Sequence, residues 1–444
     1  MSLPELPPAC EVAVVGAGAA GLATAIFTRR LNPARSVVLL EGAKRPGAKI
    51  LVSGGSRCNV TNASVTDRDF WGGRSTIVRS VLRGFPVADT VAFFRDIGVS
   101  LHEEVDGKLF PDTNRSRDVL DALLRETDRV GATLVPGCRV LDVTRVDGGF
   151  LVTTSRGELR AGAVVLATGG QSLPKTGSDG AGFNIAVHLG HALVAPTPGL
   201  VPLLLDRDAG IHHRLSGVSQ DVELAIWIDG AIGTRLTGTL LWTHFGVSGP
   251  VVLNASRHWL RAADEGRTVA LTVNFCPGRS FEQVDAGWTA LANERPKASV
   301  QTTLATMVPA SVAEALLTAL HIDGTRGLAH FTREDRRRLA HGLLAWPLPV
   351  VGTRGYNFAE VTAGGVALTE INPATMESRV CPGLYLVGEV LDVDGRIGGF
   401  NFQWAWSSGH VAGTALARRR SPAVGYSGSW PPPVDHISIP RRSE

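Results

Sequence analysis

Glycines and one acidic residue form the first group in this sequence whose types and spacing could bind a ligand. The stretch GAGAAG supplies Gly16, Gly18 and Gly21, and Glu41 follows twenty residues after the last of them. In a G-x-G-x-x-G turn the first glycine permits the bend, the second lets backbone approach a pyrophosphate, and the third permits close helix–strand packing. An acid at this distance accepts hydrogen bonds from a ribose. The spacing therefore predicts a dinucleotide site.

The segment after Glu41 could contact the rest of an extended cofactor. Residues 41–62 read EGAKRPGAKILVSGGSRCNVTN and are rich in glycine, amide and hydroxyl groups. A nicotinamide dinucleotide does not require such a loop, whereas FAD also has a ribityl chain and a ring to be held. Glycines recur in LATGG (166–170) and in GLYLVGEVLDVDGRIGGFN (383–401), at strand ends where open sheets bind ligands. These features favour FAD over NAD.

Each part of the loop has an expected contact. Lys49 would neutralise phosphate charge, Ser53 would present backbone to the ribityl chain and flavin, and Thr61 would add a directed polar contact. The residues expected to contact FAD are Gly16, Gly18, Ala19, Ala20, Gly21, Glu41, Lys49, Ser53, Gly54, Gly55, Arg57, Cys58, Asn59, Asn62, Val140, Ala167, Thr168, Gly169, Gly170, Gly388, Glu389, Asp392, Gly398, Gly399, Phe400 and Asn401.

A helix that begins after Gly398 and Gly399 is expected to serve the cofactor in a second way. The N-terminus of a helix carries about half a positive charge and free amide donors. Such donors would stabilise the negative charge that reduced flavin develops at one edge of its ring. The alternative is a glycine-rich turn used only for packing.

The sequence contains no Ser-His-Asp or metal-ligating constellation, and flavin itself performs hydride chemistry. The catalytic residue is therefore unknown, and the candidates are His244, Cys58 and Asp392, with Asp394 close to the last. A structural hydrogen bond is favoured over a catalytic role for the histidine and the aspartates. Cys58 has no partner cysteine nearby, so a packing role is favoured even though Arg57 could lower its pKa.

The elements that must position these residues form an α/β fold. Residues 11–15 and 36–41 are apolar runs typical of buried parallel strands, and residues 19–30 between them have helical character. Together they make one βαβ unit. Residues 163–167 and 383–389 repeat the buried-strand pattern, so both ends of the chain are expected to build one Rossmann-like FAD-binding domain.

The middle of the chain has a different pattern. Alternation over residues 222–228, with a turn at Asp229-Gly230, predicts a hairpin, and helix caps are expected at Ser311 and Thr332. We therefore expect an inserted β-rich, barrel-like domain plus a helical subdomain. The expected divisions are 1–195 for the first part of the FAD domain, 196–345 for the insertion (196–278 β-rich, 279–345 mainly helical), 346–420 for the second part, and 421–444 for a flexible tail.

Composition excludes several classes of protein. The chain has 444 residues with 44% hydrophobic and 19% charged residues, which is ordinary for a globular protein. The net charge of +3 is too small to indicate a nucleic-acid partner. The five cysteines have no metal-like spacing, and the N-terminal apolar run is interrupted by glycines. We expect reduced thiols, a cytoplasmic protein and no membrane contact, while the oligomeric state is undetermined.

From about residue 11 to 417 the sequence resembles the BaiN/RdsA-like family of FAD-dependent oxidoreductases, which have a glutathione-reductase-like fold. The matching stretches are GAGAAG, the loop 49–62, DGKLFPDTNRSRDV, TGSDGAGFNIAVHLGH, THFGVSGPVVL, EVTAGGV, NPATMESR and GEVLDVDGRIGGFN. Two positions depart from the pattern: Ser56, where a third glycine is usual, and Phe400, where tyrosine is common. The resemblance implies noncovalent FAD and reduction by NAD(P)H.

Three functions remain open at this point. The first is an NAD(P)H-linked reductase that passes hydride through FAD to a small hydrophobic acceptor, either a conjugated enone or a quinone-like molecule. The second is an RNA-modifying flavoprotein, against which the weak charge argues. The third is a flavin-binding protein without turnover of its own.

Overall fold

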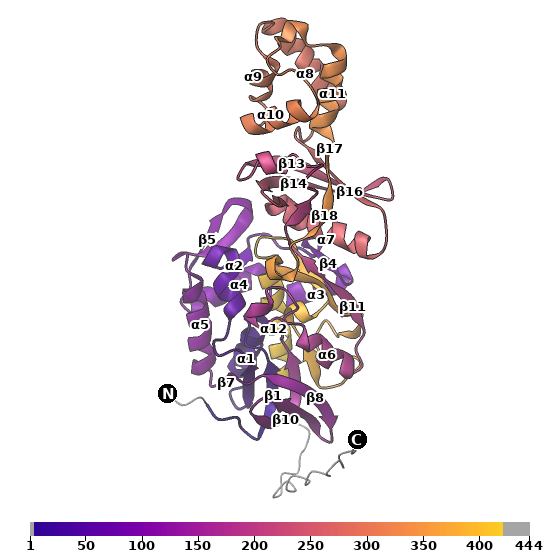
Figure 1. Cartoon of the computed structure of the whole chain (residues 1–444). Coiled ribbons are helices and arrows are strands. Elements are labelled where there is room, and N and C mark those ends of the chain that lie inside the picture. Colours follow the sequence, from indigo (N-terminus) through magenta and orange to yellow (C-terminus); the bar gives the residue numbers. More distant parts are fainter. Residues whose placement is uncertain (1–3, 421–444) are drawn as a thin grey trace, which may run out of the picture.

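The computed structural model describes residues 4–420, so the expected flexible tail at 421–444 lies outside the described residues. Figure 1 shows an elongated molecule in three successive parts. Both ends of the described chain build the part at one end, an antiparallel sheet forms the middle, and a group of helices forms the other end. Within these residues no helix is long and apolar enough to cross a bilayer.

A seven-stranded sheet forms the centre of the first part, in the order β7-β2-β1-β10-β9-β8, with β20 also paired to β10. The expected βαβ unit is confirmed, because β1 pairs in parallel with both β2 and β10. The strands are β1 (Ala9–Val15), β2 (Val37–Glu41), β7 (Thr133–Pro136), β8 (Val140–Val146), β9 (Gly149–Thr154), β10 (Gly157–Leu166) and β20 (Leu384–Leu386). The apolar residues of the parallel strands β1, β2, β10 and β20 are largely buried, because a parallel sheet is covered on both faces.

Two helices from opposite ends of the chain pack closely beside this sheet. They are α1 (Ala19–Leu31) and α12 (Phe400–Arg418), and α12 confirms the helix expected after Gly398 and Gly399. A Cβ atom at Gly409 or Gly413 of α12 would lie 2.8 Å from a backbone oxygen of α1. Glycine at these two positions therefore allows the helix backbones to approach.

Shorter elements surround this pair of helices. The helices are α2 (Ala48–Ser56), α3 (Ser75–Gly84), α4 (Val87–Asp96), α5 (Ser116–Arg129) and α6 (Ala181–His188). The strands are β3 (Thr61–Asn62), β4 (Phe70–Gly72), β5 (Leu101–Glu104), β6 (Lys108–Pro111), β11 (Leu193–Gly199), β19 (Val361–Val366) and β21 (Val393–Gly395).

The inserted domain is an antiparallel sheet in the order β17-β16-β13-β14-β15-β12-β18. Its strands are β12 (Leu203–Leu205), β13 (Ser219–Ile228), β14 (Ala231–Thr243), β15 (Gly246–Ser248), β16 (Val269–Asn274), β17 (Trp346–Leu348) and β18 (Val350–Thr353). The hairpin turn at Asp229-Gly230 is confirmed by the pairing of β13 with β14. The barrel-like domain expected here is thus a sheet with β17 and β18 as its two ends.

Strand pairing favours an insertion of about 200–355 over the expected 196–345. Strand β11 pairs with β19 and so belongs with the nucleotide domain, whereas β17 and β18 pair within the inserted sheet. The strands β17 and β18 are short and separated only by Pro349, so residues 346–353 have no clear alternating pattern.

Four helices cover the far end of the inserted sheet: α8 (Phe281–Glu294), α9 (Val300–Leu304), α10 (Ala310–Ala319) and α11 (Arg333–Leu344). The expected cap at Thr332 is confirmed, because its side chain accepts a hydrogen bond from the Asp335 amide. The cap expected at Ser311 is wrong. Helix α10 begins at Ala310, two residues earlier than such a cap requires, with Pro309 at the capping position, so Ser311 lies inside the first turn.

Helix α7 (Pro250–Asp264) joins the inserted domain to the nucleotide domain. The two domains have separate hydrophobic cores, and a small apolar cluster of Leu200, Leu253 and Val361 lies between them. Arg257 of α7 donates two hydrogen bonds, of 2.5 and 2.9 Å, to the carboxylate of Asp394 in β21. Both side chains are almost fully buried.

Candidate functional site

A cavity of about 1070 Å³ opens at the carboxyl ends of β1, β2 and β10. Gly16 has φ +102°, and a Cβ on it would lie 2.5 Å from the carbonyl oxygen of Ala167. A Cβ on Gly21 would lie 1.9 Å from the carbonyl oxygen of Gly16, whereas a Cβ on Gly18 would meet nothing within 4 Å. Gly16 thus makes the turn, Gly18 leaves open space for a ligand, and Gly21 permits the close packing, as predicted from the sequence.

The residues at this turn fit the pyrophosphate of FAD. Helix α1 starts at Ala19 without a side-chain cap, so its first amides are available at the cavity beside Gly18. Free amides and the helix dipole favour an anion at such a terminus. Glu41 lies at the end of β2 on the same cavity wall.

Glu41 also holds the glycine turn in place. One carboxylate oxygen accepts a hydrogen bond of 2.9 Å from the Ala17 amide, and the other accepts one of 2.8 Å from the Ala43 amide. The side chain is half-buried, so free lone pairs still face the cavity. It can therefore fix the turn and accept from a ribose hydroxyl at once.

We expect the Glu41→Ala variant to bind FAD about 10- to 150-fold more weakly, since a hydrogen bond to a charged group contributes roughly 1.5–3 kcal/mol. Titration of the apoprotein with FAD, followed by flavin fluorescence, measures this change. Thermal unfolding of the two apoproteins is the control for the turn. Lower apoprotein stability with unchanged FAD affinity would limit Glu41 to its structural role.

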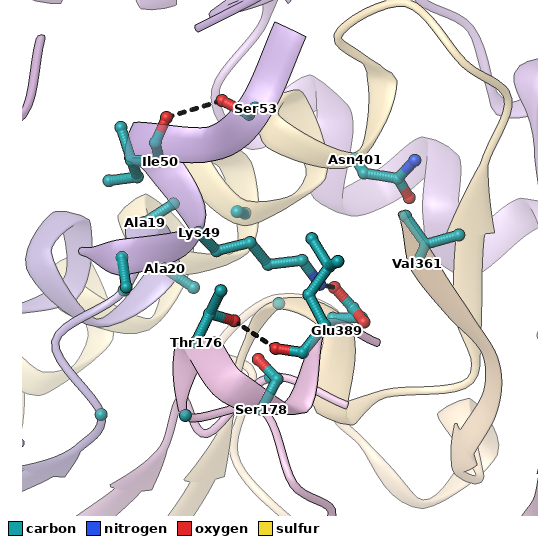
Figure 2. Close-up of a pocket in the computed structure, with 18 of the residues that line it drawn as sticks. Ala19, Ala20, Lys49, Ile50, Ser53, Thr176, Ser178, Val361, Glu389 and Asn401 are labelled. Carbon is teal, nitrogen blue, oxygen red and sulfur yellow. Dashed lines mark hydrogen bonds and ion pairs between the residues drawn. The ribbon is translucent and has the colours of Figure 1, made fainter. Parts of the chain in front are cut away.

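The loop after Glu41 is partly helical in the structure. Helix α2 covers its middle residues, but Ser53, Gly54 and Gly55 inside the helix have non-helical backbone angles. Ser53 donates to the carbonyl oxygen of Ile50, as Figure 2 shows. Ser56 has φ +66°, which explains why glycine is the usual residue at this position. Gly54 and Gly55 therefore expose backbone to the cavity, as expected for a flavin clamp.

Lys49 extends across the cavity toward Glu389 (Figure 2). Its ammonium lies 2.5 Å from a Glu389 carboxylate oxygen and 2.5 Å from the hydroxyl oxygen of Ser172. The lysine charge is thus already balanced by an acid that follows β20. The expected contact of Lys49 with phosphate remains a prediction.

The start of α12 forms the opposite end of the cavity wall. Gly398, Gly399 and Asn401 all line the cavity, and Gly399 is the N-cap residue without a side-chain cap. A Cβ on Gly399 would lie 2.4 Å from the backbone of Thr61. Glycine there is needed for packing against β3 as well as for an open helix start. The stabilisation of reduced flavin by these amides stays a prediction.

Most residues expected to contact FAD meet at this one cavity. Those that line it are Gly16, Gly18, Ala19, Ala20, Glu41, Lys49, Ser53, Gly54, Gly55, Arg57, Asn59, Val140, Ala167, Thr168, Gly169, Gly388, Glu389, Gly398, Gly399 and Asn401. Those outside its lining are Gly21, Cys58, Asn62, Gly170, Asp392 and Phe400. Asn62 supports the wall instead of lining it, because its side-chain amide donates a hydrogen bond to the Gly398 carbonyl oxygen.

None of the three catalytic candidates lines the cavity. Cys58 is fully buried, and burial raises the pKa of its thiol to about 12. Arg57 does not activate it, because the Arg57 guanidinium pairs with Glu104 and lies over the Phe110 ring. The packing role favoured for Cys58 is therefore the better interpretation.

The other candidates lie away from the cavity. His244 is exposed at the end of β14 and packs edge-to-face with Phe245. Asp392 is buried at the domain junction, where one carboxylate oxygen has no hydrogen-bond partner among the described residues. Burial and the neighbouring Asp394 raise the pKa of Asp392, and Asp394 is held by Arg257.

Residues 357–361 form a part of the cavity wall that was not expected from the sequence. This segment returns from the inserted sheet to β19 and places Phe358 and Glu360 on the cavity. Ser172, the hydroxyl partner of Lys49, was also not expected. The stretch EVTAGGV begins at Glu360 itself and covers the end of this segment, but nothing local shows that Glu360 faces a ligand.

The Rossmann-type sheet, the glycine turn and the cavity along its carboxyl edge define an FAD-binding oxidoreductase. The chain belongs to the HI0933-like family, whose Rossmann-domain model matches residues 10–415. FAD, when bound, supplies the hydride chemistry, and the protein supplies binding and orientation.

Two relatives with different substrates are about equally similar to this chain. The 3-dehydro-bile acid delta(4,6)-reductase of Clostridium scindens is 32% identical over 92% of this chain and 99% of the relative. The ribosomal RNA dihydrouridine synthase of Escherichia coli is 33% identical over 93% of this chain and 99% of the relative. Among solved structures, a quinol fumarate reductase of E. coli aligns with a TM-score of 0.49 and 16% identity, covering 92% of this chain and 70% of that chain.

Proposed function

We propose that this protein is an NAD(P)H-linked reductase that passes hydride through FAD to a small hydrophobic acceptor, either a conjugated enone or a quinone-like molecule. The observation that carries this proposal is the apolar lining of the cavity where the two domains meet. Leu200, Phe358, Val361, Ile397 and Phe402 all contribute to it. An apolar wall with few polar groups suits a flat hydrophobic ligand.

The substrates named for the two relatives share one chemical feature. A 3-oxo bile acid with delta(4,6) unsaturation is a conjugated dienone. Uracil carries its C5=C6 double bond next to the C4 carbonyl, and saturation of that bond gives dihydrouracil. The same reaction, addition of a hydride and a proton across a conjugated double bond, serves both molecules.

A second candidate function is reduction of a uridine in ribosomal RNA, which the 33% identity to the E. coli relative favours. The balance of 44 basic and 41 acidic residues gives little general attraction for RNA. We therefore place the small hydrophobic acceptor, either an enone or a quinone-like molecule, first.

An anaerobic reduction series tests both candidates. FAD-loaded protein is mixed with NADH or NADPH, and bleaching of the flavin absorbance identifies the donor. A 3-oxo-4,6-diene steroid, a quinone and a uridine-containing rRNA fragment are then added separately. Recovery of the flavin absorbance with the steroid or the quinone supports the first function, and recovery only with RNA supports the second. No recovery with any acceptor contradicts both and favours a flavin-binding protein without turnover.

A further inference from the structure

An acidic side chain on the domain-junction wall of the cavity has no assigned role. Glu360 belongs to the segment that leaves β18 and enters β19, where the chain returns from the inserted domain. Its neighbours Ala359 and Val361 are buried, whereas Glu360 is exposed and lines the cavity. Because buried and exposed residues alternate here, the carboxyl group of Glu360 lies on the open side of this wall.

The backbone of Glu360 is fixed on both sides. Its amide donates to the Leu200 carbonyl oxygen at 3.2 Å, and its own carbonyl oxygen lies 3.3 Å from the hydroxyl oxygen of Ser172. Two residues later, the Thr362 amide donates to Glu389 at 3.0 Å. These contacts tie Glu360 to the Lys49–Glu389 pair without using its own carboxyl group.

The charged groups around Glu360 leave it without a full counter-charge. Lys49 is the cation that acts on it, but the Lys49 ammonium is already paired with Glu389. Arg354, on the same segment, lies over the rings of Phe245 and Phe358. Although Glu360 is exposed to the cavity, desolvation by the protein around it raises the pKa of its carboxyl group, and Lys49 opposes this rise only in part. Glu360 therefore keeps its proton to higher pH than an ordinary glutamate.

We propose that Glu360 is a catalytic acid whose carboxyl group donates the proton to the α-carbon of the conjugated acceptor. This inference rests on the proposed function. The double bond breaks as its β-carbon takes a hydride, originally from NAD(P)H, and its α-carbon takes the proton. The acceptor gains two electrons, and Glu360 is left as a carboxylate that regains a proton from water in the cavity.

The test compares Glu360→Gln with wild type and with Glu314→Gln, which removes an exposed carboxylate from α10 in the helical part. Each FAD-loaded protein is reduced anaerobically with dithionite and mixed with the 3-oxo-4,6-diene steroid or the rRNA fragment. We expect Glu360→Gln to slow flavin reoxidation by about 10²- to 10⁴-fold, the usual contribution of a general acid. Glu314→Gln should match wild type.

Two further readouts separate an acid from a structural role. In wild type the reoxidation rate should fall as pH rises through the Glu360 pKa, because only the protonated form donates, and Glu360→Gln should lack this limb. Flavin reduction by NAD(P)H and acceptor binding, followed by spectral titration of the oxidised protein, should be unchanged. An unaltered pH profile, or equal loss of binding and of both half-reactions, would overturn the assignment.

A third readout does not depend on any acceptor. The infrared difference spectrum of wild type minus Glu360→Gln, recorded over a pH series, should keep the carbonyl band of a protonated carboxyl group to higher pH than an ordinary glutamate does. Conversion to a carboxylate band over the ordinary range of a glutamate would overturn the assignment by itself. If the carbonyl band persists to higher pH but wild type reoxidises with neither acceptor, the proposed function fails while the raised pKa of Glu360 stands.

Discussion

Replacement of Arg257 by alanine is expected to loosen the junction between the inserted domain and the nucleotide domain at a cost of about 3–5 kcal/mol. The guanidinium binds both carboxylate oxygens of Asp394 and lies over the Trp71 ring, 5.1 Å from its centroid. The Arg257 and Asp394 side chains are 10% and 2% exposed. Removal of the arginine would leave Asp394 as a buried charge with Asp392 nearby, which is why the cost exceeds that of a surface pair.

Amide hydrogen exchange measures this effect where it arises. Faster exchange is expected in α7 and β21, which carry the two partners, with little change in the central sheet. The matched control is Arg267→Ala, because Arg267 pairs with Asp229 at the surface, where the side chains are 45% and 52% exposed. Exposed pairs contribute about 0.2–1 kcal/mol.

A second variant separates charge from packing. Arg257→Met combined with Asp394→Leu removes both charges and keeps apolar volume, so it should recover much of the lost protection. Equal exchange in Arg257→Ala and in the Arg267→Ala control would show that the buried pair does not hold the domains together. Arg257→Ala should also weaken the cavity wall, since the Ile397 amide donates a hydrogen bond to Asn254, which lies in α7 as Arg257 does.

The cofactor half of the site could be predicted because its signals are local. Gly16, Gly18 and Gly21 perform three different tasks within six residues. Each task follows from the position of the glycine between the strand that ends before the turn and the helix that begins in it. Glu41 could be assigned for the same reason, since β2 ends where the second strand of a βαβ unit must end. Each of these positions follows from a turn and from the elements that the turn connects.

The substrate half could not be predicted in this way. Arg257 and Asp394 are separated by 137 residues, and neither stands in a pattern that indicates a buried pair. Glu360 reaches the cavity because the chain crosses back between two domains, which is a property of the insertion and not of the residues around it. Ser311 shows the opposite error, because a local capping pattern was present but Pro309 started the helix earlier.

The second and third tasks of the glycine turn predict different losses when Gly18 or Gly21 becomes alanine. In Gly21→Ala the new Cβ would lie 1.9 Å from the Gly16 carbonyl oxygen, so backbone must move. Overpacking of this kind costs about 1–3 kcal/mol or more, and it should lower the unfolding midpoint of the apoprotein as well as FAD binding.

In Gly18→Ala the new Cβ meets no protein atom within 4 Å, and φ of −83° suits any residue. The apoprotein should therefore unfold at nearly the wild-type midpoint. The methyl group would occupy the space where backbone approaches the pyrophosphate, so amide hydrogen bonds to phosphate are lost. At roughly 1.5–3 kcal/mol for each such bond, FAD affinity should fall by about 10- to 150-fold. Titration of each apoprotein with FAD, alongside thermal unfolding, gives both quantities for each variant. If Gly18→Ala retains wild-type affinity, the pyrophosphate does not lie at the start of α1, and the cavity must hold FAD in another orientation.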